Sequence, residues 1–301
     1  MKFADPKNDL AFKKIFGNEK HKNILISFLN TVLDFKGEKE IVDVKLVNPY
    51  QVPKIPELKE TILDIKAKNR SGENFIVEMQ KKDIGDFAES LYYTSKAYVS
   101  QLDKGKDYSK LKKVYFIGIL NFNMFENKSF ISRHLIINQE IVHQDLKDFE
   151  FTFIELPKFN KSLNELETIL DKWIYFIKNA ENLELIPKEF KSLKEFKEAF
   201  EIAKQTAWNK DELEVYEYIA LKEADEINAL KTAEKKGLQK GIEKGIQKGI
   251  KIGKEEGLKE GQKKAKIEIA KKSLKKGLEI EIIVELTGLT IEEINQIKDE
   301  L

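Results

Sequence analysis

Apolar residues recur at helical spacing over residues 12–33, near the beginning of the chain. A Gly-Asn pair at residues 17–18 interrupts this spacing, so the pattern predicts two helices, and Asp9 is placed to cap the first. Residues 41–52 then alternate in polarity and are rich in β-branched side chains, which is typical of a strand.

Two further strands are expected at residues 61–68 and 74–82. The connector between them, residues 69–73, reads NRSGE and has the composition of a turn. The two strands should therefore form a β-hairpin.

An amphipathic pattern predicts a helix over residues 86–104. Residues 114–122 are almost wholly apolar, as in a central strand that is covered on both faces. Extended runs at 134–138 and 151–156 bring the expected sheet to about five or six strands. These elements predict an α/β domain over residues 1–160, which is a normal domain size.

Only helices are expected after residue 160. Capping-box pairs, Ser162 with Glu165 and Asn209 with Glu212, precede stretches of helical spacing. We expect a helical region over residues 161–230, in which one group of residues supplies a core face: Trp173, Ile174, Phe176 and Ile177.

Glycine recurs every four residues from Gly237 to Gly261, and Leu or Ile mostly follows it. In an isolated helix these seven glycines would cost roughly 7 kcal/mol relative to alanine. A four-residue repeat also drifts by about 40° per step around a helix, too fast for a left-handed coiled coil. The segment 231–264 is therefore expected to be a close-packed helix contact in an oligomer, a right-winding helix or a flexible arm.

The last segment, residues 265–301, is helical again, and a TGLT sequence at 287–290 separates two short helices. Thr290 and Glu293 form another capping-box pair. The pattern predicts a helical hairpin, a shape shared by helix-turn-helix motifs and by ordinary packing units.

Charge is balanced overall, with 53 basic and 52 acidic residues, but it is uneven along the chain. Between Lys231 and Lys276 there are 16 lysines and 6 glutamates, a surplus of ten positive charges. Such a segment fits a polyanion such as nucleic acid, and it fits a solvated helix equally well.

The composition excludes cysteine-based chemistry and favours a cytoplasmic location. The chain has no cysteine, which excludes disulfides, thiolate catalysis and zinc-thiolate sites. The first ten residues contain no apolar run, so no secretory signal is expected. The longest uncharged apolar stretch, residues 114–125, is shorter than the roughly 20 residues of a membrane span. We therefore expect a cytoplasmic protein with no membrane partner.

The residues best suited to chemistry lie on the predicted hairpin. Asp64 should face away from both of its apolar neighbours, Leu63 and Ile65, while Glu78 and Gln80 share one face of the next strand. Closing the turn brings Asp64 beside Glu78. Two converging carboxylates suit a hard cation such as Mg²⁺, which takes one or two carboxylates together with water and substrate phosphate. The same spacing is also common among solvent-side residues of a half-exposed hairpin.

Residues 3–160 resemble the PD-(D/E)XK nuclease-family transposases, also called recombination-promoting nucleases. Four pieces match in the family's order, and a tail run, AKKSLKKGLEIEIIVELTGLTIEEI, is also frequent there. The pieces are DPKNDLAFKKIFG (5–17), ILDIKAKNRSGENFIVEMQ (62–80), LYYTSKAYVSQLDKGKDY (91–108) and VYFIGILNF (114–122). The resemblance implies a restriction-endonuclease-like α/β/α core with a central mixed sheet, followed by an all-helical C-terminal region.

The resemblance also implies a metal site on the hairpin. It makes Asp64 and Glu78 the metal-binding carboxylates and the Met79 carbonyl a further ligand. The cofactor would be Mg²⁺ or another divalent cation such as Mn²⁺ or Ca²⁺, which lowers the pKa of bound water and offsets charge on the scissile phosphate.

Gln80 falls where the wider superfamily has its lysine, so the lysine's role is left unassigned. Lys66 and Lys82 are candidates on the predicted site face, and Lys13 is a candidate on the first helix. Asp9 matches the family's opening motif, and either reaches the metal through water or only caps its helix.

The helix at 86–104 matches the family's following helix, which lines the DNA backbone cleft in related nucleases. The matching residues are Tyr93, Gln101 and Tyr108. Tyrosines at such positions are also common as core and rim residues.

The resemblance implies an endonuclease that hydrolyses DNA phosphodiester bonds with little sequence preference, in recombination or in a mobile element. Two other functions remain open. One is an inactive DNA-binding or oligomerisation module of the same fold, and the other is a structural homo-oligomer assembled through the glycine repeat. No sequence feature indicates strand transfer or recognition of DNA ends.

Overall fold

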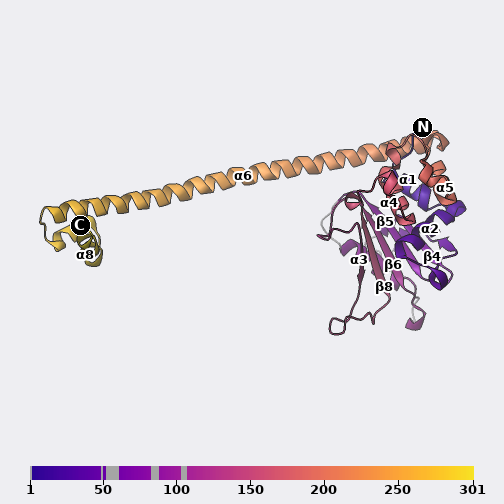
Figure 1. Ribbon diagram of the computed structural model, residues 1–301, viewed down its shortest axis with the longest axis horizontal. Coiled ribbons are helices and arrows are strands. Elements are labelled where there is room, and N and C mark those ends of the chain that lie inside the picture. The colour runs from indigo at the N-terminus through magenta and orange to yellow at the C-terminus, as the bar shows by residue number, and fades with distance from the viewer. Residues whose placement is uncertain (1, 49, 52–60, 83–87, 103–106) are drawn as a thin grey trace. The chain divides into compact units, whose positions relative to one another are not determined.

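The computed structural model in Figure 1 describes residues 2–48, 50–51, 61–82, 88–102 and 107–301. The chain forms two compact units, residues 1–225 and 226–301, and each is described by itself. None of the described helices is long and apolar enough to cross a membrane.

A six-stranded mixed sheet forms the centre of the first unit, in the order β1-β4-β5-β6-β8-β7. Strands β5, β6 and β8 are parallel, and the other neighbours are antiparallel. A two-stranded ribbon of β2 and β3 stands apart from this sheet. The strands are β1 Val44–Leu46, β2 Tyr50–Gln51, β3 Thr61–Ile62, β4 Ile65–Asn69, β5 Asn74–Gln80, β6 Val114–Leu120, β7 Ile131–Leu135 and β8 Phe149–Glu155.

The predicted hairpin and central strand are both confirmed. Ile65 pairs with Val77 across an antiparallel β4–β5 hairpin, and Gly72 in its turn takes φ +90°, which favours glycine. Every residue of β6 is buried between its parallel neighbours β5 and β8. The hairpin strand expected over 61–68 is interrupted, however, because β3 ends at Ile62 and β4 begins at Ile65.

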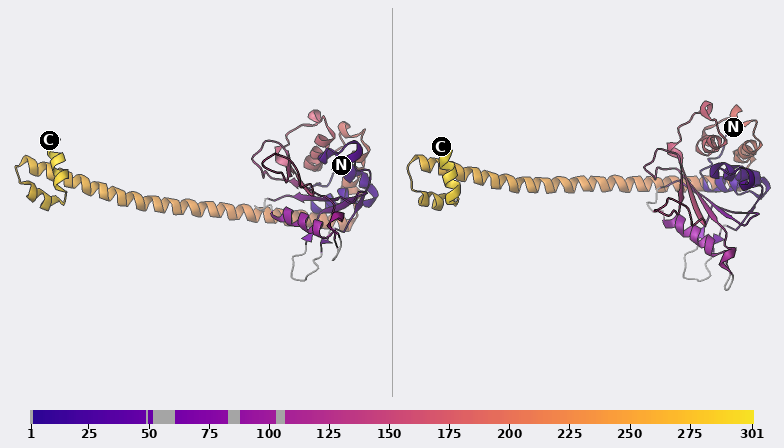
Figure 2. Two further views of the ribbon diagram at one scale, coloured as in Figure 1. Left: turned by 90° about the horizontal axis from the view of Figure 1, so that it is seen from below. Right: turned by 60° about the horizontal axis from the view of Figure 1, so that its bottom comes forward.

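Helices cover both faces of the sheet (Figures 1 and 2). On one face lie α1 Asp9–Phe16, α2 Lys22–Leu33, α4 Ile169–Asn179 and α5 Lys194–Ala203, and on the other lies α3 Ala88–Val99. The ends of the helix expected over 86–104 lie outside the described residues. The expected α/β/α core with a central mixed sheet is thus confirmed. Short 3₁₀ helices join the elements: η1 Glu19–His21, η2 Gly37–Lys39, η3 Tyr108–Lys110, η4 Leu156–Lys158, η5 Leu163–Glu165, η6 Ala180–Asn182, η7 Lys188–Phe190 and η8 Gln205–Ala207.

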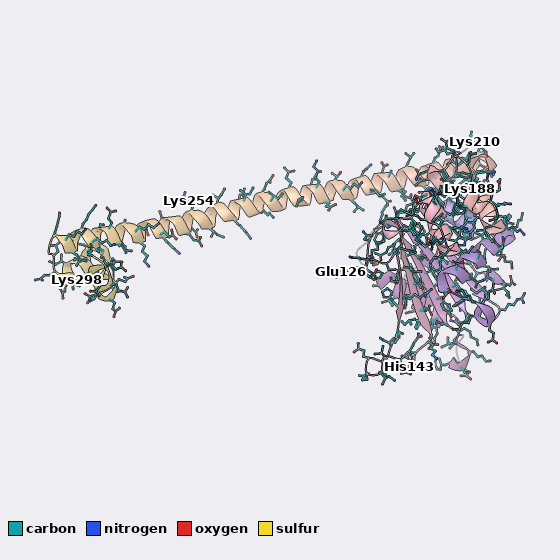
Figure 3. The ribbon with its side chains drawn as sticks, in the orientation of Figure 1. Glu126, His143, Lys188, Lys210, Lys254 and Lys298 are labelled. Atoms are coloured by element: carbon teal, nitrogen blue, oxygen red, sulfur yellow. The ribbon has the colours of Figure 1, made fainter. Side chains whose placement is uncertain are left out.

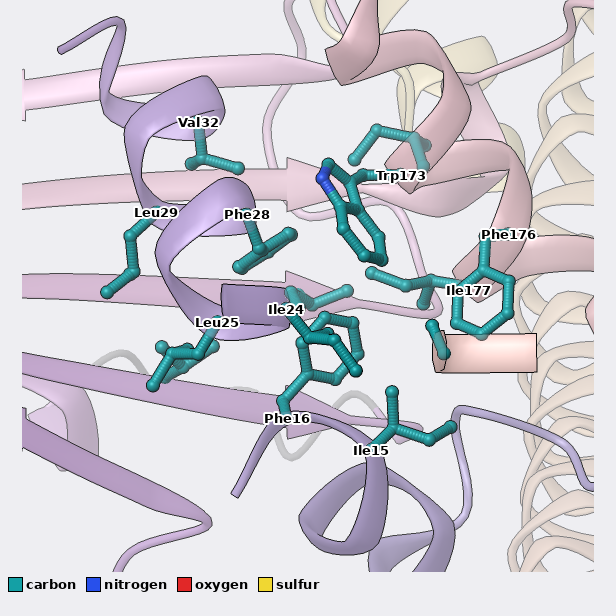
Figure 4. Packing of buried hydrophobic residues seen from close by; sticks show 14 of the residues in the cluster. Ile15, Phe16, Ile24, Leu25, Phe28, Leu29, Val32, Trp173, Phe176 and Ile177 are labelled. Carbon is teal, nitrogen blue, oxygen red and sulfur yellow. The ribbon is translucent and has the colours of Figure 1, made fainter. Parts of the chain in front are cut away.

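The larger core lies between the sheet and the four-helix face, and Figure 4 shows its packing. Trp173 is fully buried, contacts Phe16 and Phe28, and stacks on Phe196 with ring centroids 4.0 Å apart. The core face predicted from the 173–177 run is therefore confirmed. Since α4 and α5 supply much of this core, the sheet depends on helices beyond residue 160; the division of the chain at 160, 230 and 264 stays a prediction.

Helix α6 is one continuous α-helix from Lys210 to Lys275, so the glycine repeat is helical rather than irregular. Of its 66 residues Ala270 and Ser273 are buried, and Figure 3 shows side chains projecting along its length. Apart from the adjacent residues and the nearby backbone of α6 itself, no described atom lies within 4 Å of the position that a Cβ would take at any glycine from 237 to 261. Packing within the described chain therefore does not require these glycines.

The C-terminal hairpin is also confirmed. The end of α6 packs against α7 Ile280–Thr287 and α8 Ile291–Asp299 around a small core that includes Ala270, Ile283 and Ile294. Gly288 ends α7 at φ +65°, and the predicted capping box of Thr290 and Glu293 begins α8.

Candidate active site

Asp64 lies at the interruption between β3 and β4. Leu63 packs in the cluster on the α3 side of the sheet, and Ile65 packs in the cluster on the opposite side. The expectation that these two neighbours share one face was therefore wrong, because the interruption breaks the two-residue alternation of a regular strand. This break leaves the Asp64 side chain at the open end of the β4–β5 hairpin.

The structure brings Asp64 and Glu78 together through two hydrogen bonds. The amide of Asp64 donates to Oε1 of Glu78 at 3.2 Å, and Oδ2 of Asp64 accepts from the amide of Met79 at 2.7 Å. Both side chains are shielded from solvent, with exposures of 15% for Asp64 and 7% for Glu78. The two carboxylates therefore meet in a site of low solvation.

The Met79 carbonyl is directed to the β4 side of β5, the side on which Asp64 lies. Neighbouring residues of a strand direct their backbone groups to opposite sides, and each residue directs its N–H and C=O to the same side. The Gln80 carbonyl accepts from Asn121 at 2.8 Å on the β6 side, while the Met79 amide donates to Asp64 on the β4 side. The Met79 carbonyl therefore also lies on the Asp64 side.

Helix α1 adds a lysine and a third carboxylate to this pair. Nζ of Lys13 lies 2.6 Å from Oδ1 of Asp9 and 3.5 Å from Oδ1 of Asp64. The helix is capped by Asn8, whose side chain accepts from the amides of Leu10 and Ala11. Asp9 is therefore not the cap, and it stands one helical turn from Lys13 on the side of the helix that faces the hairpin.

Burial dominates the electrostatics of the site. It raises the pKa of Asp64 to about 6, and the neighbouring Asp9 adds to the effect, although the Met79 amide and Lys13 act in the opposite direction. Burial alone would lower the pKa of Lys13, but Asp9 and Asp64 outweigh it, and the pKa is raised. Lys13 and the Met79 amide therefore do not fully offset the cost of ionising the buried Asp64 carboxylate.

The other two lysine candidates are placed differently. Lys66 pairs with Ile76 across the hairpin, and it makes no hydrogen bond or ion pair with the described carboxylates. Burial lowers the pKa of Lys66, and the nearby Lys68 lowers it further. Lys82 is half-buried, two residues beyond the end of β5. Of the three candidates, Lys13 is the one placed 3.5 Å from Asp64.

Two of the three residues matched to the following helix, Gln101 and Tyr108, lie away from this site. Tyr93 packs at the edge of the cluster on the α3 side. The Gln101 side chain exchanges two hydrogen bonds with the backbone of Lys112, at the opposite end of β6 from the strand position beside Glu78. Tyr108 lies in η3 and is 80% exposed.

A group of charges that no sequence pattern indicated lies immediately beyond β5. Nζ of Lys81 lies 3.3 Å from Oδ2 of Asp5 and 2.6 Å from Oε2 of Glu223, which belongs to α6. The amide of Asp5 also donates to the Tyr216 hydroxyl of α6 at 2.9 Å. These contacts hold the first turns of α6 against Asp5 and Lys81, the residue that follows Gln80. Sequence spacing carried no signal for them, because Glu223 is 142 residues from Lys81.

Replacing Glu223 with Gln is expected to lower the free energy of unfolding by about 1–3 kcal/mol, since it leaves the poorly exposed Lys81 with one carboxylate in place of two. Chemical denaturation of the full chain measures the change. Glu217→Gln is the control, because it removes an equal charge from an exposed position of the same helix. Equal stabilities of the two variants would show that the contact between Lys81 and Glu223 does not hold α6 in place.

The described residues contain no cluster of three or more His, Asp or Glu side chains arranged to hold a metal. The site offers instead two carboxylates, Asp64 and Glu78, with one carbonyl, that of Met79. These are hard oxygen donors, and a set of this size suits a cation that keeps several waters, as Mg²⁺ does. The residues present therefore fit such an ion.

Comparison with known families matches two parts of the chain. The family model described as PD-(D/E)XK nuclease family transposase matches residues 6–233, which include α1, the hairpin and the first turns of α6. The model described as the C-terminal HTH domain of the Rpn/YhgA-like nuclease family matches residues 263–299. No curated protein and no solved structure gives a match.

Proposed function

The chain belongs to the PD-(D/E)XK nuclease family transposases, and from this we propose that it is a metal-dependent endonuclease hydrolysing phosphodiester bonds in DNA. The observation that carries the proposal is the meeting of Asp64, Glu78 and Lys13 at the open end of the hairpin, within the residues that match the family. PD-(D/E)XK nucleases generally use divalent metal ions. We infer little sequence preference, a role in recombination or in a mobile element, and a cytoplasmic location for the protein.

Asp64, Glu78 and the Met79 carbonyl would hold the ion. Mg²⁺ is the first choice, and Mn²⁺ or Ca²⁺ are alternatives with the same preference for oxygen. When bound, the ion supplies a water of lowered pKa and positive charge for the phosphate. The raised pKa of Asp64 supports this assignment, because a buried carboxylate that is costly to ionise is relieved by a cation beside it.

Three other residues would position the phosphate and the attacking water. Lys13 is placed to pair with a phosphate oxygen, in the role that the superfamily lysine leaves open at Gln80. Asp9 holds the Lys13 ammonium at 2.6 Å and orients it. The Gln80 amide, at the end of β5, would hydrogen bond to the attacking water.

DNA is the proposed partner of the second unit as well. The match of residues 263–299 to an HTH domain supports this, together with the lysine surplus between 231 and 276. Binding through lysine–phosphate contacts should fall steeply with salt concentration.

We also infer that the glycine stripe of α6 (residues 237–261), which winds around the helix, packs against a second copy of the chain. Glycine permits close approach of two helices, and every glycine from 237 to 261 has open space where its Cβ would be. The adjacent apolar side chains are exposed and would be covered by the same contact: Leu238, Ile242, Ile246, Ile250 and Leu258.

Cleavage of supercoiled plasmid tests the proposed function. The full chain is incubated with Mg²⁺, Mn²⁺, Ca²⁺ or EDTA, and nicked and linear products are separated on gels. Nicking that requires a metal and is lost in Glu78→Gln, but not in Glu73→Gln in the hairpin turn, supports the proposal. If no ion supports cutting while the protein still binds DNA, the chain is an inactive binding module of the same fold.

A further inference from the structure

Four lysines lie around the β1–β4 edge of the sheet, and we call them the lysine row: Lys45, Lys66, Lys68 and Lys112. Lys45 on β1 pairs directly with Lys68 on β4. Lys66 precedes Lys68 by two positions, so both project from the same face of β4. Lys112 joins them at the turn, where the side chains of Lys112 and Lys68 flank Gly72.

The lysine row lies on the face of the sheet that carries Glu78. Lys66 pairs with Ile76, which packs in the cluster on the α3 side, whereas its neighbours Ile65 and Ala67 pack on the other side. Glu78 follows Ile76 by two positions on β5 and so shares its face. The row therefore begins beside the carboxylates and continues toward the hairpin turn.

This concentration of positive charge has no acidic counterpart among the residues that the structure describes. No ion pair or side-chain hydrogen bond joins any Nζ of the row to a described carboxylate, whereas the adjacent Lys113 pairs with Glu150 at 2.7 Å. Like charges directly opposite each other on two strands destabilise a sheet. Lys45 and Lys68 therefore lower stability without any gain from an ion pair within the described fold.

Protection of a sheet edge against aggregation explains only part of the row. Lysines on edge strands serve that purpose, and β1 is an edge strand. Lys66 and Lys68 lie on β4, however, which is paired on both sides, and Lys66 is half-buried. The ammonium of a half-buried lysine without a carboxylate partner is poorly compensated, and an anion such as phosphate would compensate it.

We propose that the lysine row binds the phosphate backbone of DNA, leading one strand from the Asp64–Glu78 site along β4 toward the hairpin turn. The proposal rests on the proposed nuclease function and adds the direction in which the substrate lies. Alternate residues of a strand are roughly 6.6 Å apart, similar to the step between successive phosphates, so Lys66 and Lys68 match neighbouring phosphates. Phosphate contacts of this kind orient DNA without reading its sequence.

Fluorescence anisotropy with a labelled duplex tests the lysine row. The full chain carries Asp64→Asn throughout, so that binding is measured without cleavage, and the salt concentration is varied. Each of Lys66→Gln and Lys68→Gln is expected to weaken binding several-fold. Each should also make the plot of log K against log salt less steep, with a slope less negative by about 0.9. Lys→Arg at either position should restore the slope, because the positive charge is kept.

The matched controls are the single variants Lys188→Gln and Lys191→Gln, each of which removes the same charge from an exposed position in or beside η7. Row variants that bind with the affinity and salt slope of the parent would overturn the inference. An equal loss in the controls would also overturn it, since the effect would then come from net charge. Plasmid nicking by the chain with native Asp64 tests the nuclease function separately. A failure of the lysine-row proposal in the binding assay can therefore be told apart from a failure of the nuclease proposal.

Discussion

Asp64→Asn is expected to reduce metal-dependent plasmid nicking by about 10³-fold or more. A catalytic metal contributes several kcal/mol to the transition state, and each 1.4 kcal/mol corresponds to about tenfold in rate. The side-chain oxygen of the introduced asparagine can still accept from the Met79 amide, so the hairpin keeps its shape while one charged ligand is lost. Gel assays over a range of metal concentrations measure the loss.

The same substitution should make the metal-free protein more stable at neutral pH. The pKa of Asp64 is about 6 in the folded chain and about 3.9 in an unfolded one, so the ionised carboxylate opposes folding above pH 6. Asparagine cannot ionise, and the gain should be on the order of 1–3 kcal/mol at pH 7.5 in EDTA. It should diminish as the pH falls from 6 toward 4, because the folded chain then holds Asp64 protonated and the unfolded chain gains progressively less from ionising it.

Denaturant titrations at pH 7.5 and pH 4 measure this difference. Asp171→Asn is the control, and its change in stability should have the opposite sign. Burial would raise the pKa of Asp171, but the hydrogen bonds from Thr168 and Lys161 outweigh burial, and the pKa is lowered. That variant should lose stability at pH 7.5. Loss of both nicking and stability in Asp64→Asn would show that Asp64 is a structural carboxylate rather than a metal ligand.

Lys13→Met is expected to slow nicking by about 10²–10³-fold, the usual effect of removing one group that stabilises charge in a transition state. The raised pKa keeps Lys13 protonated throughout the working pH range, so its charge is always available to a phosphate. Single-turnover cleavage at saturating metal isolates this effect from metal binding. Lys13→Arg should recover part of the rate, since it restores the charge.

Lys20→Met is the control, because it removes a lysine from an exposed position between α1 and α2. Normal nicking by Lys13→Met, with loss in Lys66→Met or Lys82→Met, would move the lysine's role to one of those positions. The three variants together therefore assign the charge that Gln80 does not supply.

Much of the fold could be predicted because its signals are local. Helical spacing, the apolar 114–122 run, the turn at 69–73 and the capping boxes each depend on residues close together in the chain. The meeting of Asp64 and Glu78 belongs to the same class, since the length of a hairpin turn sets which residues lie opposite each other. The family resemblance, confirmed by the match over residues 6–233, added the identity of the domain.

The surroundings of the carboxylates could not be predicted in this way. Sequence patterns favoured Lys66 as the catalytic lysine, with Lys82 and Lys13 as further candidates, and they placed Leu63 and Ile65 on one face. Only the packing of α1 against the sheet places Lys13 at Asp64, and only the interruption before β4 separates the two apolar neighbours.

By itself, the sequence determined most of the elements, the hairpin register and the pair of acids on it, because neighbours in the chain control backbone conformation and strand alternation. The tertiary structure alone decided which residues complete the site. Lys13 reaches Asp64 across 51 positions, and Glu223 reaches Lys81 across 142. Such contacts depend on how buried faces pack together, so no local pattern in the sequence predicts them.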